Sequence, residues 1–343
     1  MLDADVEVDR PDFAVRAALS VPPGERLALF GPSGAGKTTI LEAIAGLVPV
    51  RRGRVVLNGR VLTSASRPVR AVPPWQRRVG LLRQEPGLFP HLPVRDNLAY
   101  GRGRRHRAGS AELAELAGLL DIGGLLTAMP ARLSGGQAHR VALGRLLLAD
   151  CDALLLDEPY SGLDTALRRS LTGLVSRLVG ERQVPAIMVA HELPDAQAFA
   201  GRLAVLDRGE ILQTGASHEV VLRPASRRVA ELVGYLGFVP VRPGGAAGAG
   251  DGEAIVAGVH PDRVVAGAHP DRGVVVAGTV TSCVPAGAGW EVTLSTSGAV
   301  VVCRLADRPA ARDGRLVVTA LEPPCFGPDG TVRRVTDDWQ LSA

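Results

Sequence analysis

The chain has 343 residues, of which 46% are hydrophobic but only 3% aromatic, and its formal net charge is +4. This length permits a full core and a second domain, whereas the weak positive charge, spread along the chain, gives no reason to expect nucleic-acid binding. No apolar run reaches the ~18 residues that a membrane-spanning helix needs. Because positions 3, 5, 7 and 9 are acidic, we also expect no signal peptide at the N-terminus.

Short apolar runs alternate with helical stretches through the first two thirds of the chain. Several runs lack polar interruptions, as expected for strands that are buried on both faces. They predict strands at 26–30, 54–57, 78–82, 153–156, 186–190 and 202–206. This alternation indicates a mostly parallel α/β sheet. Between residues 84 and 140 the pattern becomes mainly helical, which predicts a helical subdomain inserted in a first domain spanning 1–235.

The composition changes after this domain. Residues 236–252 are rich in Gly and Pro and predict a flexible linker. Residues 253–343 contain short Val-rich alternating segments that Gly and Pro separate, at 273–280, 290–294 and 299–305. We therefore expect a small β-barrel-like module after the linker.

A glycine-rich loop follows the first predicted strand and opens a helix predicted at 37–46. Lysine and arginine together number 39, and the only lysine, Lys37, lies in this loop. Its compact ammonium can reach the β- and γ-phosphates of a nucleotide, while backbone N–H groups surround them and the Thr38 hydroxyl binds Mg²⁺. The predicted phosphate-binding residues are Gly31, Pro32, Ser33, Gly34, Ala35, Gly36, Lys37, Thr38 and Thr39.

Two carboxylates end the apolar run at 153–156. Asp157 lies at the strand end, where it can hold Mg²⁺, and Glu158 is placed to orient and deprotonate an attacking water. An acidic pair after a strand could instead be a helix cap. Because it follows the glycine loop by about 120 residues, the catalytic interpretation is favoured.

Three further features fit the same chemistry. Ser134, Gly135, Gly136 and Gln137 precede a helical stretch, so their N–H groups form either a second anion site or a simple helix cap. Gln84 follows a strand and begins the helical insertion. His191 follows the run at 186–190 and can reach a γ-phosphate, although a lone His is more often structural.

Together these motifs resemble the ATP-binding subunit of an ABC transporter, over about residues 1 to 232. The corresponding segments are Walker A (31–38), the Q-loop (Gln84), the signature (133–137), Walker B (153–158), the D-loop (161–164) and the H-loop (His191). The resemblance implies a P-loop NTPase fold of the ABC ATPase type, with the helical subdomain and the β-barrel-like domain as additions. Arg83, Gly162 and the pair at 138–139 depart from the family pattern, but none removes a catalytic group.

The family also implies a homodimer with two ATP molecules between the subunits, each bound by the Walker motifs of one chain and the signature of the other. Glu158, His191 and Gln84 would be catalytic, and Thr38, Gln84 and Asp157 would hold Mg²⁺. Phe13 would stack on adenine, and Asp164 would join the signature at the nucleotide. The dimer would bind an integral membrane permease at the cytoplasmic face of the plasma membrane, and would serve an extracytoplasmic solute-binding protein indirectly.

Segments 77–84, 88–91 and 94–101 resemble the molybdate importer ATPase, and the C-terminal module resembles its TOBE/Mop-like domain. The Ser-Ala-Arg-Asn motif of that domain is missing. The module therefore either holds the dimer together or binds the transported anion through backbone amides with Thr281 and Ser282. Sulfate, ferric iron, polyamine or sugar remain alternative cargoes, and a non-transport ABC ATPase acting on DNA or the ribosome is a third possibility.

Overall fold

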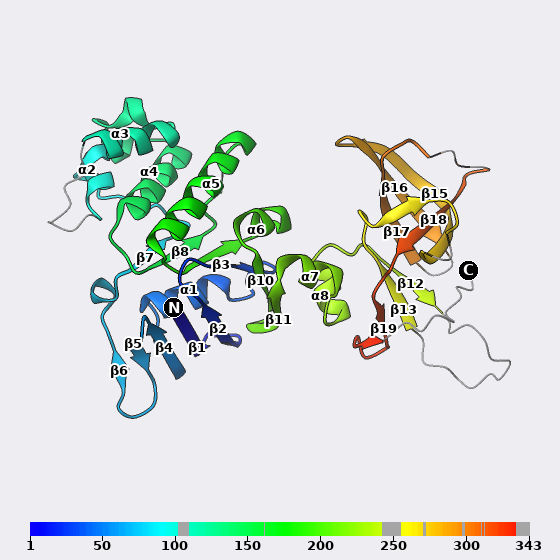
Figure 1. The fold of residues 1–343 in the computed structure, drawn as a ribbon, viewed down its shortest axis with the longest axis horizontal. Helices are drawn as coiled ribbons and strands as arrows, with labels where there is room; N and C mark the ends of the chain where they lie inside the picture. Colours follow the sequence, from blue (N-terminus) through cyan, green and yellow to red (C-terminus); the bar gives the residue numbers. More distant parts are fainter. Residues whose placement is uncertain are drawn as a thin grey trace. The chain divides into compact units, whose positions relative to one another are not determined.

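The computed structural model describes residues 1–101, 110–160, 162–241, 255–269, 272–296, 299–309, 311 and 313–333. The chain divides into two compact units, Met1–Ser217 and His218–Ala343 (Figure 1). This division falls before the domain boundary predicted at residue 235. Among the described residues, no helix has both the length and the apolar character that crossing a bilayer requires.

The first unit is built on an eleven-stranded sheet in the order β6-β5-β4-β1-β2-β11-β10-β3-β9-β8-β7. Its strands are β1 (Leu2–Asp9), β2 (Ala14–Val21), β3 (Arg26–Phe30), β4 (Arg52–Leu57), β5 (Arg60–Ser64), β6 (Arg70–Ala71), β7 (Val79–Leu82), β8 (Ala153–Asp157), β9 (Ala186–Ala190), β10 (Arg202–Asp207) and β11 (Glu210–Ala216). Strands β10, β3, β9, β8 and β7 pair in parallel. The mostly parallel sheet predicted from the sequence is therefore correct for this half, but β1, β2, β4, β5 and β6 pair antiparallel.

The apolar runs explain the parallel half. Every residue of β8 and β9 is buried, because helices and neighbouring elements cover both faces. The carboxyl ends of β3, β8 and β9 reach the same edge of the sheet, so the segments that follow these strands meet there. By contrast, β1 alternates buried apolar and more exposed acidic residues, as an antiparallel strand with two different faces does.

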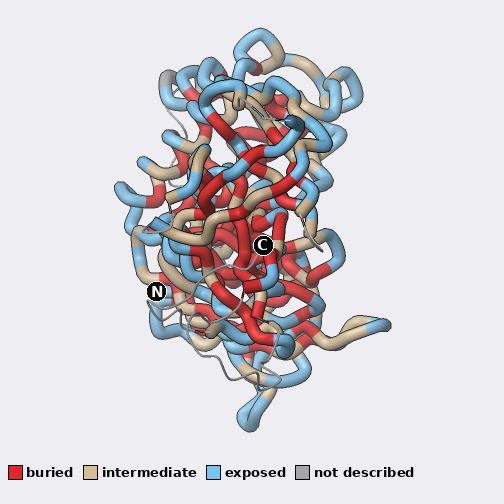
Figure 2. The backbone as a smooth tube through the Cα atoms, turned by 90° about the vertical axis from the view of Figure 1, so that its right-hand side faces the viewer, coloured by how far each residue is buried: buried red, intermediate tan, exposed pale blue. Residues whose placement is uncertain are grey.

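Helices flank this sheet. They are α1 (Lys37–Ala45), α2 (Val94–Ala99), α3 (Ser110–Leu119), α4 (Gly135–Leu148), α5 (Thr165–Arg182) and α6 (Leu193–Phe199). Figure 1 shows α2, α3 and α4 grouped together, away from β1, β2 and β4. The region predicted as helical, 84–140, thus contains α2, α3 and the start of α4. In Figure 2 the buried segments run mostly through the interior and the exposed segments lie mostly at the periphery.

The second unit is rich in β-structure, as predicted. Its elements are α7 (Ser217–Leu222), α8 (Arg227–Leu232), β12 (Gly237–Val241), β13 (Ile255–Val259), β14 (Val264–Ala266), β15 (Gly273–Ala286), β16 (Gly289–Thr296), β17 (Ala299–Leu305), β18 (Arg315–Leu321), β19 (Cys325–Phe326) and β20 (Val332–Arg333). The strands form one sheet in the order β12-β13-β19-β20 and another in the order β14-β18-β15-β16-β17. The linker predicted at 236–252 is wrong for 237–241, which form β12 because they pair with β13; residues 242–252 lie outside the described residues.

Candidate active site

The glycine loop connects β3 to α1 in a conformation that needs its glycines. Gly31 has φ 155°, and a Cβ there would lie 2.0 Å from the carbonyl oxygen of Leu206. Gly36 has φ 102°, and a Cβ would lie 2.7 Å from Val15 Cγ2. Only glycine fits both positions, so the loop can approach the sheet closely and turn directly into α1.

Lys37 is the first residue of α1, and its side chain points back into the loop. Its Nζ donates hydrogen bonds to the carbonyl oxygens of Gly31 and Pro32, both at 2.8 Å. The residue is only 4% exposed. Burial lowers the pKa of Lys37, while the carboxylates of Glu158 and Asp157 oppose this shift. The loop therefore holds a buried ammonium where a phosphate would supply the missing negative charge.

Thr38 and Asp157 join α1 to the end of β8. The Thr38 hydroxyl donates a hydrogen bond to Oδ2 of Asp157 at 2.9 Å. Asp157 is 4% exposed, and its Oδ1 is buried with no hydrogen-bond partner within the described part of the chain. Burial is the main cause that raises the pKa of Asp157. A buried carboxylate oxygen without a donor beside a hydroxyl is a suitable pair of ligands for a hard cation such as Mg²⁺.

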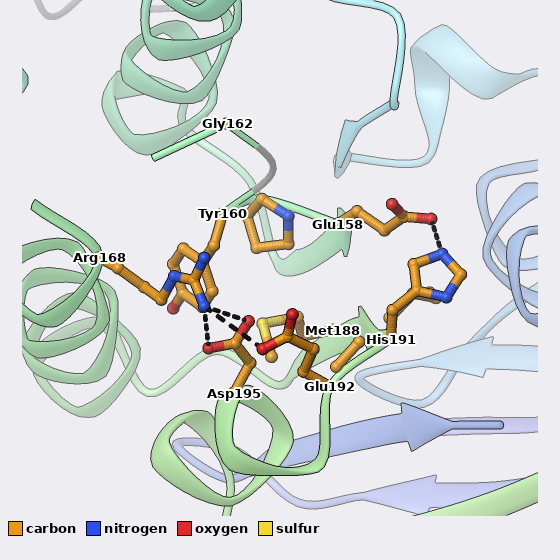
Figure 3. Close-up of a pocket in the computed structure, with 11 residues that line it drawn as sticks. Glu158, Tyr160, Gly162, Arg168, Met188, His191, Glu192 and Asp195 are labelled. Atoms are coloured by element: carbon orange, nitrogen blue, oxygen red, sulfur yellow. Dashed lines mark hydrogen bonds and ion pairs between the residues drawn. The ribbon is translucent and has the colours of Figure 1, made fainter. Parts of the chain in front are cut away.

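Glu158 and His191 face each other from the ends of β8 and β9. His191 Nε2 donates a hydrogen bond to Oε1 of Glu158 (Figure 3). Glu158 has φ 51°, a left-handed conformation that a non-glycine residue adopts at a cost and that is common at functional sites. This backbone turn redirects the chain after β8, so the Glu158 carboxylate meets the imidazole while Asp157 faces Thr38.

One pocket of about 480 Å³ collects most of the predicted residues. Its lining includes the predicted Phe13, Ser33, Gly34, Gly36, Lys37, Thr38, Thr39, Gln84, Glu158 and His191. Sequence reasoning missed Arg10, Pro11 and Asp12, which also line it. They belong to the turn between β1 and β2, where Arg10 N donates to the carbonyl oxygen of Phe13 at 3.0 Å. Gly31, Pro32 and Ala35 shape the loop without lining this pocket.

The signature residues do not line this pocket. Ser134 and Gln137 form a reciprocal capping box at the start of α4: Ser134 Oγ accepts from Gln137 N at 3.3 Å, and Ser134 N donates to Gln137 Oε1 at 2.9 Å. Asp164 caps α5 by accepting from Ala166 N at 2.9 Å and Leu167 N at 3.0 Å. The local helix-cap geometry is thus present at both segments. Ser161 of the D-loop lies outside the described residues.

A second pocket, of about 250 Å³, lies against the same pair of side chains. Glu158 and His191 line both pockets, so their hydrogen bond stands between them. Among the other residues that line the second pocket, Arg168 Nη1 donates to Asp195 Oδ1 at 3.0 Å and lies 3.8 Å from Glu192 Oε2 (Figure 3). This ion pair ties the start of α5 to α6.

Comparisons with known proteins agree with this geometry. Residues 15–161 match the family model described as ABC transporter. The "Fe(3+) ions import ATP-binding protein FbpC" of Pseudomonas fluorescens is 42% identical over 226 residues, which are 66% of this chain and 63% of the relative. The "Molybdenum import ATP-binding protein ModC" of Brucella abortus is 39% identical over 208 residues, which are 61% of this chain and 57% of the relative. The chain thus matches less than two thirds of the length of these relatives.

Solved structures give the same fold. A structure described as the ATP binding subunit of an ABC transporter has a TM-score of 0.56 and 24% identity, covering 68% of this chain and 94% of that chain. A bacterial Atm1-family ABC exporter with ATP bound has a TM-score of 0.56 and 26% identity, covering 67% of this chain and 41% of that chain. The matched part of this chain therefore has the P-loop fold of an ABC ATPase.

Proposed function

We propose that this protein is the ATP-hydrolysing subunit of an ABC importer. The observation that carries the proposal is the convergence of Lys37, Gln84, Glu158 and His191 on one pocket, next to the Thr38–Asp157 pair. These residues follow three strands and one glycine loop that are far apart in the sequence. Phosphoryl transfer needs positioning and charge stabilisation, and this pocket supplies a cation, a metal-binding pair and a base.

ATP would lie along the pocket from Phe13 to Glu158. The half-buried Phe13 would stack on the adenine at one end. At the other end Lys37 would exchange the loop carbonyls that it now contacts for the β- and γ-phosphate oxygens, which are stronger acceptors. The N–H groups at the start of α1 would surround the same phosphates.

Thr38, Asp157 and Gln84 would hold Mg²⁺. The unpartnered Oδ1 of Asp157 is the observation that fits a cation there, since a buried carboxylate oxygen is costly without a partner. Bound Mg²⁺ supplies charge neutralisation for the phosphates. Asp157 and Thr38 already hold each other in place by their 2.9 Å hydrogen bond, so little rearrangement is needed for binding.

Glu158 would act as the base for hydrolysis. Its carboxylate would orient a water molecule for in-line attack on the γ-phosphorus and take the proton from it. The O–P bond to the attacking water forms as the bond to the ADP oxygen breaks, which releases ADP and inorganic phosphate. His191 would position the Glu158 carboxylate through their hydrogen bond and then face the γ-phosphate.

The signature would complete the site of a second subunit. Ser134 and Gly135 are exposed, and a Cβ built on Gly135 meets no atom within 4 Å in the described chain. No described residue of the subunit therefore requires glycine there, whereas close approach of a second subunit's nucleotide would. Together with Gly136 and Gln137, and with the exposed Asp164 at the start of α5, they would contact ATP across a homodimer interface.

The Glu158→Gln variant tests this composite site. It should bind MgATP without hydrolysing it, and so accumulate as a closed dimer that elutes earlier from a sizing column. Lys37→Ala is the matched control and should remain a monomer at the same MgATP concentration. If Glu158→Gln stays monomeric while binding MgATP, the proposal that residues of two subunits together form each ATP site is wrong.

For the cargo we propose molybdate or a related oxyanion. The segments 77–84, 88–91 and 94–101 support this choice, and one group of relatives is named for molybdenum import. Ferric iron is the second candidate, because relatives named for Fe(3+) import are similar at up to 42% identity. The subunit would act at the cytoplasmic face of the plasma membrane, bound to an integral membrane permease that receives the ion from an extracytoplasmic solute-binding protein.

The second unit would be the TOBE/Mop-like domain of such a subunit. The exposed Thr281 donates its hydroxyl to the carbonyl oxygen of Thr293 at 3.2 Å, so this side chain is engaged within the sheet. That contact engages the hydroxyl proton of Thr281, which argues against Thr281 donating a hydrogen bond to a transported anion.

A deletion strain separates the two cargoes. A molybdenum-dependent enzyme activity should be lost at trace molybdate and restored at high molybdate, while growth on limiting ferric iron should be normal. Normal enzyme activity at trace molybdate combined with poor growth on limiting ferric iron would instead identify ferric iron as the cargo.

A further inference from the structure

Arg10 lies at the edge of the nucleotide pocket, outside every motif described above. Its guanidinium donates to the Thr39 hydroxyl from Nε at 2.8 Å and from Nη2 at 2.6 Å. Nη2 also contacts Glu42 Oε2 at 3.1 Å. These contacts fix the guanidinium against the first turns of α1, where Thr39 is only 4% exposed.

The guanidinium still has a free donor. Within the described part of the chain, Nη1 of Arg10 has no hydrogen-bond partner, and the side chain is 36% exposed. Arg10 lines the same pocket as Phe13 and Lys37. A planar guanidinium that is anchored on two sides and open on the third can bind an anion at little entropic cost.

The position of Arg10 along the pocket indicates which anion. Arg10 and Phe13 belong to one turn, since Arg10 N donates to the Phe13 carbonyl oxygen at 3.0 Å. Thr39, which anchors the guanidinium, follows Lys37 and Thr38 in α1. ATP extends from its base through ribose and α-phosphate to the β- and γ-phosphates. A cation between the base end and the Lys37 end therefore faces the α-phosphate.

We propose that Arg10 is a nucleotide-binding residue that contacts the α-phosphate. The inference rests on the proposed function, because it assumes that the adenine lies on Phe13 and the γ-phosphate near Lys37. Glu42 keeps the guanidinium in place, and the α-phosphate completes its hydrogen bonding. Since ATP and ADP share this phosphate, Arg10 contributes equally to binding both nucleotides.

A structural brace is the alternative role, and Arg83 provides the matched control. Arg83 Nη2 contacts the other oxygen of the same carboxylate, Glu42 Oε1, at 3.4 Å, yet Arg83 does not line the pocket. Removing Arg83 therefore takes an arginine away from Glu42 without removing a pocket cation. A defect that arises only through Glu42 would appear in both variants.

The experiment compares the wild type with Arg10→Ala, Arg10→Lys and Arg83→Ala by isothermal titration calorimetry. The probes are MgADP and the Mg²⁺ complex of a β,γ-imido ATP analogue. Arg10→Ala should weaken both by about 10- to 100-fold, as expected for one charge-assisted hydrogen-bonded contact. The affinity of Arg10→Lys should lie between those of the wild type and Arg10→Ala, because an ammonium keeps the charge but lacks the planar, two-donor geometry of a guanidinium. Arg83→Ala should bind both as the wild type does.

Three results would overturn the inference. These are unchanged affinity in Arg10→Ala, an equal loss in Arg83→Ala, or a loss for the ATP analogue alone, which would place Arg10 at the γ-phosphate. A wild type that binds neither probe would instead refute the proposed function. Steady-state kinetics gives a second readout: the KM for MgATP should rise in Arg10→Ala while kcat stays within about twofold, as for loss of uniform binding.

Discussion

Arg77 is a buried arginine that holds the far end of α1, and its loss should destabilise the first unit. The residue is 4% exposed. Its guanidinium donates to the carbonyl oxygens of Val72 at 2.7 Å and Ile44 at 2.9 Å, and to the Thr63 hydroxyl at 2.9 Å. A cation at the last carbonyls of a helix also interacts favourably with the helix dipole.

The magnitude follows from these three bonds; a fourth contact, from Nη1 to the Ala43 carbonyl oxygen at 3.4 Å, shares its donor with the Ile44 bond and is not counted. Burial of the guanidinium lowers the pKa of Arg77, which shows that desolvation offsets part of the gain, so we count about 1 kcal/mol per bond. Arg77→Ala should then cost about 3 kcal/mol in the free energy of unfolding. For a unit the size of Met1–Ser217, this corresponds to a fall in Tm of about 6 to 12 °C.

Arg78 is the matched control for Arg77. Its side chain is 47% exposed and pairs with Asp150 at 3.0 Å and Asp152 at 2.9 Å. Exposed ion pairs contribute about 0.5 kcal/mol each, so the two pairs together contribute about 1 kcal/mol and Arg78→Ala should lower Tm by about 2 to 4 °C. The assay is thermal unfolding followed by circular dichroism, using the transition that MgADP raises. Equal Tm values for Arg77→Ala and Arg78→Ala would refute the reasoning.

Three further predictions concern the pocket. Asp157→Asn should remove Mg²⁺-dependent ATP hydrolysis. Because burial raises the pKa of Asp157 in the folded state, the wild type should lose stability relative to Asp157→Asn as pH rises above about 4. A Tm difference between the wild type and Asp157→Asn that stays constant from about pH 4 to 8 would contradict this. Phe13→Ala should raise the KM for MgATP about tenfold and Phe13→Trp should preserve it, and equal KM values in steady-state assays would remove Phe13 from the adenine site. His191→Ala should lower kcat about 100-fold with little change in KM because it releases Glu158, and a rise in KM alone would assign His191 to binding.

Much of the parallel half of the sheet could be predicted, because continuous apolar runs such as 153–156 and 186–190 are distinctive. β1 could not be identified by that signal. Its apolar residues Leu2, Ala4, Val6 and Val8 alternate with acidic ones, a pattern of period two that indicates a strand with one exposed face. No strand is predicted from the sequence at β1 or at its neighbour β2, whereas the strand predicted at 54–57 is β4, which pairs antiparallel with the other side of β1.

The candidate site was predictable where a motif constrains both residue type and spacing. The motifs single out Lys37, Glu158 and His191, and the structure places all three along one pocket. Arg10 and Arg77 were missed for a physical reason. Each acts through contacts with residues distant in sequence, Arg10 with Thr39 and Arg77 with Ile44, and no local pattern marks an arginine for such a contact.

Phosphate release from MgATP by the purified protein tests the central claim most directly. The wild type should hydrolyse ATP only when Mg²⁺ is present. Lys37→Ala, at an unchanged Tm in the absence of nucleotide, should hydrolyse it at least about 100-fold more slowly, since the variant loses the buried cation of the pocket. Equal rates for the wild type and Lys37→Ala would show that this pocket is not where ATP is hydrolysed.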